Sequence, residues 1–246
     1  ASSPVPTLQA TFIFSVYFTT AVMPDGGTAA WAWMTSATAF AVAVVAPLLG
    51  RLADRHGWLK ACLGMVTIIG AVATAGLWFV LPDPHYALSA LALSAASIFA
   101  MEIGFVFYNA MLPSVAAEPE YGRASGLAWG LGYVGAIIAL GLVLLLFVLP
   151  AEPALGIGKA DAAHIRITMC FAALWLVVFA LPLFLFVRQP AAKTDATPFL
   201  ASLRQSMGLA IRIPDMARFL LARMLFADGL VTLFAFGGIY AATVFG

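Results

Sequence analysis

The sequence predicts an all-α integral membrane protein, and three observations lead to this fold class. Hydrophobic residues make up 63% of the 246 residues, and charged residues make up only 9%. The mean hydropathy is +1.03, whereas a soluble domain with an ordinary hydrated surface carries about 25% charged residues. The apolar residues also form long runs without strand-like alternation, which indicates spanning helices of about 20 residues and excludes the strands of a membrane barrel.

Apolar runs follow one another along the chain, and we expect each to form one spanning helix. They cover residues 3–24, 28–50, 60–81, 86–112, 124–149, 165–187 and 217–244. Proline, glycine or charged residues separate them, as at Asp25-Gly26-Gly27 and Pro82-Asp83-Pro84. Because the first run begins almost at residue 1 and the last is followed by no polar tail, we expect a chain that is truncated at both ends.

The basic residues predict which helix ends face the cytoplasm. The connections after the first, third and fifth runs contain only Lys159 and Arg166. The connections after the second, fourth and sixth runs contain Arg51, Arg55, Lys60, Arg123, Arg188, Lys193, Arg204, Arg212 and Arg218. The positive-inside rule therefore places the N-terminus and the even-numbered connections in the cytoplasm, and we expect a location in the cell (inner) membrane.

The sequence gives no sign of enzyme chemistry, of a metal or cofactor site, or of nucleic-acid binding. Neither HExxH nor GxSxG occurs, and His56, His85 and His164 lie in different connections. Cys62 and Cys170 lie inside apolar runs, and we interpret them as small buried side chains. The net charge of +1 reflects the topology and gives no indication of an anionic partner.

A seven-helix receptor or sensor is an alternative that the number of apolar runs suggests. A retinal protein needs a lysine in its last helix for the Schiff base, and residues 217–246 contain none. The expected orientation, with the first helix starting in the cytoplasm, is also opposite to that of such receptors. Both observations favour a different class of membrane protein.

The connection from Gly50 to Lys60 reads Gly-Arg-Leu-Ala-Asp-Arg-His-Gly-Trp-Leu-Lys. We expect a short charged hinge, in which Gly50 and Gly57 allow two helices to approach closely and the charges stay outside the lipid. The pattern resembles the signature loop between helices 2 and 3 of major facilitator superfamily transporters. The resemblance implies that Gly50, Asp54, Arg55, Gly57 and Lys60 form a conformational lock. The alternative is an ordinary cytoplasmic loop whose basic residues only follow the positive-inside rule.

The fourth run contains an acidic residue, Glu102, together with Tyr108 and Asn109. Glu102 and Asn109 are seven residues apart and share one helix face. Glu102 lies about 24 Å of helix from Tyr86, and a charge at such depth costs about 2.5–3.5 kcal/mol on insertion scales. These residues could therefore couple protons or bind substrate. Equally, Glu102 could be a structural acid that is paired between helices.

The seventh run contains Arg223 and Asp228, which lie about 140° apart around a helix. Arg223 is close enough to the cytoplasmic end for its side chain to extend to the surface. Asp228 is short and lies near the helix centre. We therefore favour Asp228 over Arg223 as a residue that contacts substrate or protons.

The fifth run is rich in glycine at helical spacing. Gly126 and Gly130 form one small-xxx-small pair, and Ala128 and Gly132 form another, with Gly135 following. Such faces allow helices to pack closely and to move against one another. We interpret these glycines as helix-packing residues.

Several further side chains could line a cavity. Trp129 and Tyr133 are four residues apart on one face of the fifth run, where a packing stripe is the alternative. Gln9, Thr11 and Ser15 bring polar groups into the first run. The sequence leaves open whether these groups bond a neighbouring helix or a substrate.

Two segments are specific enough to resemble a particular branch of the superfamily. Residues 107–113 read Phe-Tyr-Asn-Ala-Met-Leu-Pro, and residues 125–135 read Ser-Gly-Leu-Ala-Trp-Gly-Leu-Gly-Tyr-Val-Gly. Both closely resemble the vacuole-effluxer-like family, and residues 220–229 and 11–18 are similar to its seventh and first helices. This resemblance implies a fold of two six-helix halves and a function in amino acid efflux. Leu59 departs from it, since a basic residue is usual there.

These observations together predict a secondary active transporter that moves a small polar solute by alternating access. Residues 1–187 form the six-helix N-terminal half, 188–216 the cytoplasmic linker, and 217–246 the start of the C-terminal half. The expected partners are the lipid bilayer, the small-molecule substrate and protons. A facilitator without proton coupling is the alternative mechanism.

Overall fold

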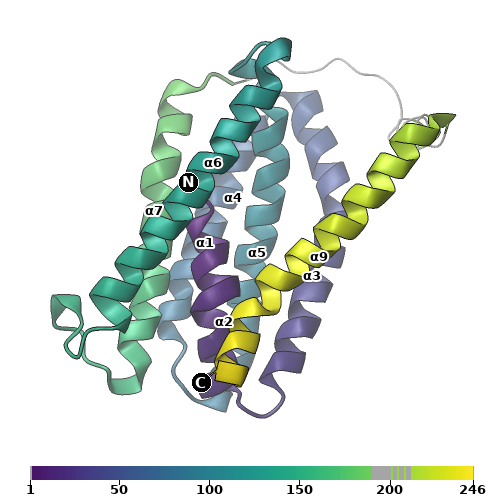
Figure 1. Cartoon of the computed structure of the whole chain (residues 1–246). Helices are drawn as coiled ribbons and strands as arrows, with labels where there is room; N and C mark the ends of the chain where they lie inside the picture. Colours follow the sequence, from purple (N-terminus) through teal and green to yellow (C-terminus); the bar gives the residue numbers. More distant parts are fainter. Residues whose placement is uncertain (1, 190–200, 202–203, 205–207, 209–211, 246) are drawn as a thin grey trace.

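The computed structural model describes residues 2–189, 201, 204, 208 and 212–245, and within them all regular structure is helical. The long helices run alternately up and down and form one bundle (Figure 1). Six spans are long and apolar enough to cross a membrane, and a bent helix adds a seventh. The predicted all-α membrane bundle is therefore confirmed.

The first span runs from Pro4 to Val22 in the middle of the bundle (Figure 1). It consists of α1 (Pro4–Pro6), η1 (Thr7–Phe12), α2 (Phe14–Tyr17) and η2 (Phe18–Val22). In its most apolar stretch 56% of the residues are buried, whereas in that of the second span 6% are buried. Its η segments are π-helical turns, which often occur at functional sites and here lie among buried side chains.

The second span is α3 (Gly27–His56), and the third is α4 (Leu59–Gly76) with the short η3 (Leu77–Phe79). The predicted hinge over Gly50–Lys60 is wrong in its extent, because α3 continues as a helix to His56. Only Gly57 and Trp58 connect the two helices.

Two physical reasons explain why the helix continues. A glycine inside a helix, such as Gly50, costs only about 1 kcal/mol, so it does not by itself end one. Gly57 ends α3 because it adopts a left-handed conformation with φ of 65°, which glycine reaches without strain.

The remaining helices agree with the predicted runs to within a few residues. The short helices of the connections are η4 (Pro84–Tyr86), η5 (Leu112–Ser114), η6 (Glu118–Glu120), η8 (Ala154–Gly156) and η9 (Ala160–Ala162). The long ones are α5 (Ala87–Ala110), α6 (Tyr121–Val143) with η7 (Leu144–Val148), α7 (Ala163–Phe186) and α9 (Pro214–Phe245). A bend of 45° divides α9 between Phe234 and Phe236. Most of the predicted linker at residues 188–216 lies outside the described residues.

Two groups of buried apolar side chains hold the bundle together. The larger group surrounds the first span and includes Leu8, Phe14, Phe18 and Trp31, all fully buried. The Trp31 ring on α3 lies 5.5 Å from that of Phe18 and 6.4 Å from that of Phe14. The second group joins α3, α4 and α5 near the α3–α4 turn.

A buried hydrogen-bond network links the first span to α4 and α5. Ser97 Oγ donates to Gln9 Oε1 at 2.8 Å and lies 2.8 Å from Thr74 Oγ1. Gln9 Nε2 donates to the carbonyl of Ser94 at 3.4 Å. All four residues are at most 1% exposed. Because no water reaches these groups, the network fixes the position of the first span.

Arg166 binds the opposite end of the bundle together, although it lies on the side that is poor in basic residues. Its Nη1 donates to the carbonyl of Trp78 at 2.6 Å, and its Nε donates to that of Asp161 at 3.0 Å. The guanidinium also lies 4.9 Å from the centre of the Trp78 ring. A cation at the carbonyl end of a helix is favourable, so Arg166 fastens α7 to the end of η3.

We expect Ser97→Ala to lower the free energy of unfolding by about 1 kcal/mol, because it leaves the Gln9 amide oxygen and the Thr74 hydroxyl without their shared partner. The thermal midpoint in detergent measures this. Ser89→Ala is the control, since Ser89 is an exposed hydroxyl at the start of the same helix that bonds the Tyr86 carbonyl. Equal midpoints for the two variants would contradict a stabilising role of the network.

Candidate functional site

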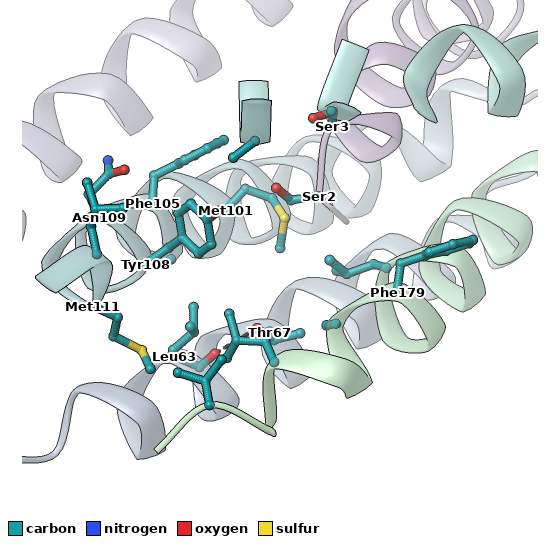
Figure 2. A pocket seen from close by; sticks show the side chains of 18 of the residues that line it. Ser2, Ser3, Leu63, Thr67, Met101, Phe105, Tyr108, Asn109, Met111 and Phe179 are labelled. Carbon is teal, nitrogen blue, oxygen red and sulfur yellow. Dashed lines mark hydrogen bonds between the residues drawn. The ribbon is translucent and has the colours of Figure 1, made fainter. Parts of the chain in front are cut away.

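A cavity of about 420 Å³ lies between α4, α5, α6 and α7. Its polar lining consists of hydroxyl and amide groups: Ser2, Ser3, Thr67, Tyr108, Asn109 and Ser125. Figure 2 shows Leu63 and Thr67 of α4 on the side opposite Tyr108 of α5. None of the described lining residues carries a charged side chain, so the cavity offers neutral polar groups and apolar surface to a bound molecule.

A row of aromatic side chains connects α5 and α6 beside this cavity. The Phe105 and Trp129 rings are almost parallel, with centres 5.9 Å apart and planes inclined by 8°. The Tyr133 ring follows at 5.9 Å from Trp129. Trp129 is 53% exposed and Tyr133 is 48% exposed, so the row has a free surface. Trp129 lines the cavity and also stacks between Phe105 and Tyr133. Its position therefore agrees with both roles considered for it from the sequence, cavity lining and helix packing.

The structure brings together only some of the predicted residues of the fourth run. Tyr108 and Asn109 both line the cavity. Glu102 does not line it, although it lies on the exposed part of the same helix, one turn before Phe105. Glu102 therefore lies on the same face of α5 as Phe105 and Asn109 but beyond the lining of the cavity.

Arg223 and Asp228 lie on α9, away from the cavity. Both are exposed, and neither contributes to the cavity lining. The α9 helix contacts the first span further along, where Gly238 packs against the backbone of Thr11 and Phe12. The structure therefore does not unite the predicted residues of the fourth and seventh runs in one site.

The predicted lock residues gather at the end of α3 and the start of α4. A Cβ atom on Gly50 would lie 3.2 Å from Val106 Cγ1, so Gly50 allows α3 to approach α5. Asp54 and Lys60 are partly buried, and Arg55 is exposed.

The glycines of α6 have different surroundings. A Cβ atom on Gly132 would lie 2.7 Å from Ser3 Oγ, and one on Gly135 would lie 3.9 Å from the Trp175 ring. These two positions therefore face other helices. A Cβ atom on Gly126 or Gly130 would have no described atom of another segment within 4 Å, so nothing covers these two positions in the described part of the chain.

Two features of the site were missed by the sequence reasoning. One is Phe105, which completes the aromatic row. Its position four residues before Asn109, on the same helix face, could have indicated that it lies at the cavity. Gln189 hydrogen-bonds the α3–α4 turn through Gly57 and Lys60. No local pattern distinguishes Gln189, because its partners are more than 100 residues away in the sequence.

The family model described as vacuole effluxer Atg22 like matches residues 25–246. The chain belongs to this family. It is also similar to an uncharacterized MFS-type transporter, YxiO of Bacillus subtilis (strain 168), with 26% identity over 198 residues. That match covers 77% of this chain and 44% of the relative, so the chain spans less than half of the relative's length. No solved structure matches the chain significantly.

The family assignment confirms the resemblance drawn from residues 107–113 and 125–135, and with it the membership in a transporter family. The protein is thus a multi-pass membrane protein of a transporter family. Among the described residues, no three His, Cys, Asp or Glu side chains come together as metal ligands.

Replacing Gly50 with leucine should lower the thermal midpoint of the protein in detergent. The new side chain would meet Val106 and force α3 away from α5, and overpacking of this kind costs about 1–3 kcal/mol. Gly141→Leu is the matched control, because the described residues leave open space around Gly141. If both variants unfold together with the parent protein, Gly50 is not a close-contact position.

Proposed function

We propose that the protein is a secondary active transporter that moves a small polar solute by alternating access and is coupled to protons. The observation that carries this proposal is the cavity between α4, α5, α6 and α7 in a member of a transporter family. A cavity of about 420 Å³ has room for a molecule of amino acid size. Its neutral polar groups could replace the water around such a solute.

The proposal includes a division of the protein into two halves. Residues 1–187 are the N-terminal half, residues 188–216 are the cytoplasmic linker, and residues 217–246 begin the C-terminal half. The much greater length of the relative supports this division. So does the uncovered face of the bundle, where Glu102, Trp129, Gly126 and Gly130 are exposed. A second half would cover this face and place these side chains between the halves.

The α3–α4 turn is proposed to lie in the cytoplasm. The turn, the α5–α6 connection and the end of α7 lie at one end of the bundle (Figure 1). This end carries Arg51, Arg55, Lys60, Arg123 and Arg188. The positive-inside rule places such an end in the cytoplasm.

Amino acids are the proposed substrate class, and efflux is the proposed direction. The family description as vacuole effluxers supports export of a solute. The lining supports a solute with both polar and apolar parts, because Tyr108, Asn109 and Ser125 lie beside Phe179 and Leu183. Asp228 on α9 would join this site only after a movement of α9.

Glu102 is the proposed proton-coupling residue. Its carboxyl group lies inside the span Pro84–Ala110, where an ionised form is costly unless water or a cation reaches it. A carboxyl group that meets water in one conformation and lipid or protein in the other would gain and lose a proton in each cycle. This alternation would connect solute movement to the proton gradient.

Counterflow and uptake of a pooled amino acid mixture in proteoliposomes, with the full-length protein, test this function. We expect an imposed pH gradient to accelerate uptake at least tenfold in the parent protein and not in Glu102→Gln. Counterflow should persist in that variant, because exchange requires no net proton movement. Glu120→Gln, at an exposed site in η6 before α6, is the control. Flux that ignores both gradient and variant would instead establish a facilitator without proton coupling.

Asp54→Ala should reduce the transport rate about tenfold while the Kd for substrate changes less than twofold. The reason is that Asp54, near the end of α3, does not line the cavity and would act on the conformational change instead of on substrate binding. Initial rates and equilibrium binding measure the two quantities. Glu118→Ala, at the same end of the bundle but outside the turn, should leave both unchanged. An unaltered rate in Asp54→Ala would remove the lock assignment.

A further inference from the structure

The turn between α3 and α4 leaves backbone groups of two helices without partners inside those helices. A helix end has free carbonyl groups at its C-terminus and free N–H groups at its N-terminus. The residue before α4 is Trp58, whose side chain has no oxygen to accept a bond from the N–H groups that follow. The sequence around the turn therefore lacks the usual cap of α4.

Gln189, just after α7, supplies a cap for both helices. Its Oε1 accepts a hydrogen bond from the backbone N–H of Lys60, in the first turn of α4, at 3.1 Å. Its Nε2 donates to the carbonyl of Gly57, at the end of α3. One amide side chain thus bonds the negative end of α3 and the positive end of α4, from 129 and 132 residues away in the sequence.

Lys60 makes the reciprocal contact from the turn to α7. A cation in the first turn of a helix is electrostatically unfavourable. The Lys60 ammonium group avoids this position, because its Nζ donates to the carbonyl of Val187 at 2.6 Å, at the carbonyl end of α7. The lysine of the turn therefore caps α7, while the glutamine after α7 caps the turn.

Apolar packing supports these hydrogen bonds from within the bundle. Leu59 and Leu63 of α4 are buried in the group of side chains to which Leu183, Phe184 and Val187 of α7 also belong. At the other end, Arg166 fastens α7 to η3 through the Trp78 carbonyl. Because α4 and α7 are joined at both ends, a movement of α7 must also move the α3–α4 turn.

We propose that Gln189 and Lys60, together called the clasp, are positioning residues that hold the α3–α4 turn on the end of α7 and thereby set the equilibrium of the lock. This inference rests on the proposed function, since it assigns a role to the clasp in alternating access. The cavity reaches the same end of the bundle, where Met111, Val115 and Val187 line it. The clasp is therefore formed in a state whose cavity extends toward this end of the bundle.

The expected size of the effect follows from the strength of helix caps. Loss of one cap changes an equilibrium constant about fivefold. Because Gln189 and Lys60 act on the same contact, their effects should not multiply in the double variant. If the clasp had a purely local role, its loss would change only the hydrogen exchange of the backbone amides in the turn. The equilibrium between states with an open and a closed cavity would stay the same.

Cysteine labelling of the full-length protein in membranes tests the proposal. The background carries Cys62→Ala and Cys170→Ala, and Ser125→Cys in the cavity lining reports its accessibility to a maleimide. We expect Gln189→Leu and Lys60→Met each to lower the labelling rate about fivefold, and the double variant to lower it no further. Lys60→Arg keeps a donor for the Val187 carbonyl and should restore most of the parent rate.

Arg188→Leu is the control, because among the described residues Arg188 makes no hydrogen bond or ion pair with the turn. Elution as a single peak from a gel-filtration column confirms that each variant is folded. Labelling rates within twofold of the parent for both folded clasp variants would overturn the proposal. Labelling needs no substrate, so it tests the clasp independently of transport. If the variants change the labelling rate as expected but the protein transports no solute, the clasp is supported and only the proposed function fails.

Discussion

Polar groups inside the spans must find partners within the protein, and this constraint determines how the bundle is assembled. No water is present at membrane depth to bond the Gln9 amide or the Ser97 hydroxyl, so the two bond each other, and Thr74 completes the set. Tyr17 meets the same need when its hydroxyl donates to the carbonyl of Val80 at 2.9 Å. These contacts fix the first span at the centre, and the surrounding helices pack against it.

Burial is unevenly distributed around this centre, and the uneven distribution suggests where movement occurs. The α4 and α7 helices are joined to each other at both ends, through Lys60 and Arg166. By contrast, few residues of the second span are fully buried, and a Cβ atom on Gly126 or Gly130 of α6 would meet no described atom of another segment. In the proposed alternating access, α4 and α7 would form the rigid part, and the less buried faces of α3 and α6 would exchange partners.

The sequence predicted the spans well because a helix that crosses a membrane must be apolar over about 20 residues. It predicted the hinge poorly, since Gly50 and the charged residues after it remain helical, and Gly57 alone ends α3. Tyr108 and Asn109 were predicted as site residues because they follow an acid, Glu102, on the same helix. Both residues line the cavity. Gln189 was not predictable, because its role depends on contacts between distant parts of the chain. The surroundings of Asp228 depend on how α9 packs, which helical periodicity does not specify.

The most direct test of the central claim, that the protein couples solute transport to proton transport, is to measure whether a solute gradient drives protons across the membrane. The full-length protein in lightly buffered liposomes with an entrapped pH indicator would receive a pulse of an amino acid that it exchanges. The account predicts a pH change inside the liposomes that depends on the protein and scales with the solute gradient. Solute entry at the same rate with a constant internal pH would contradict it.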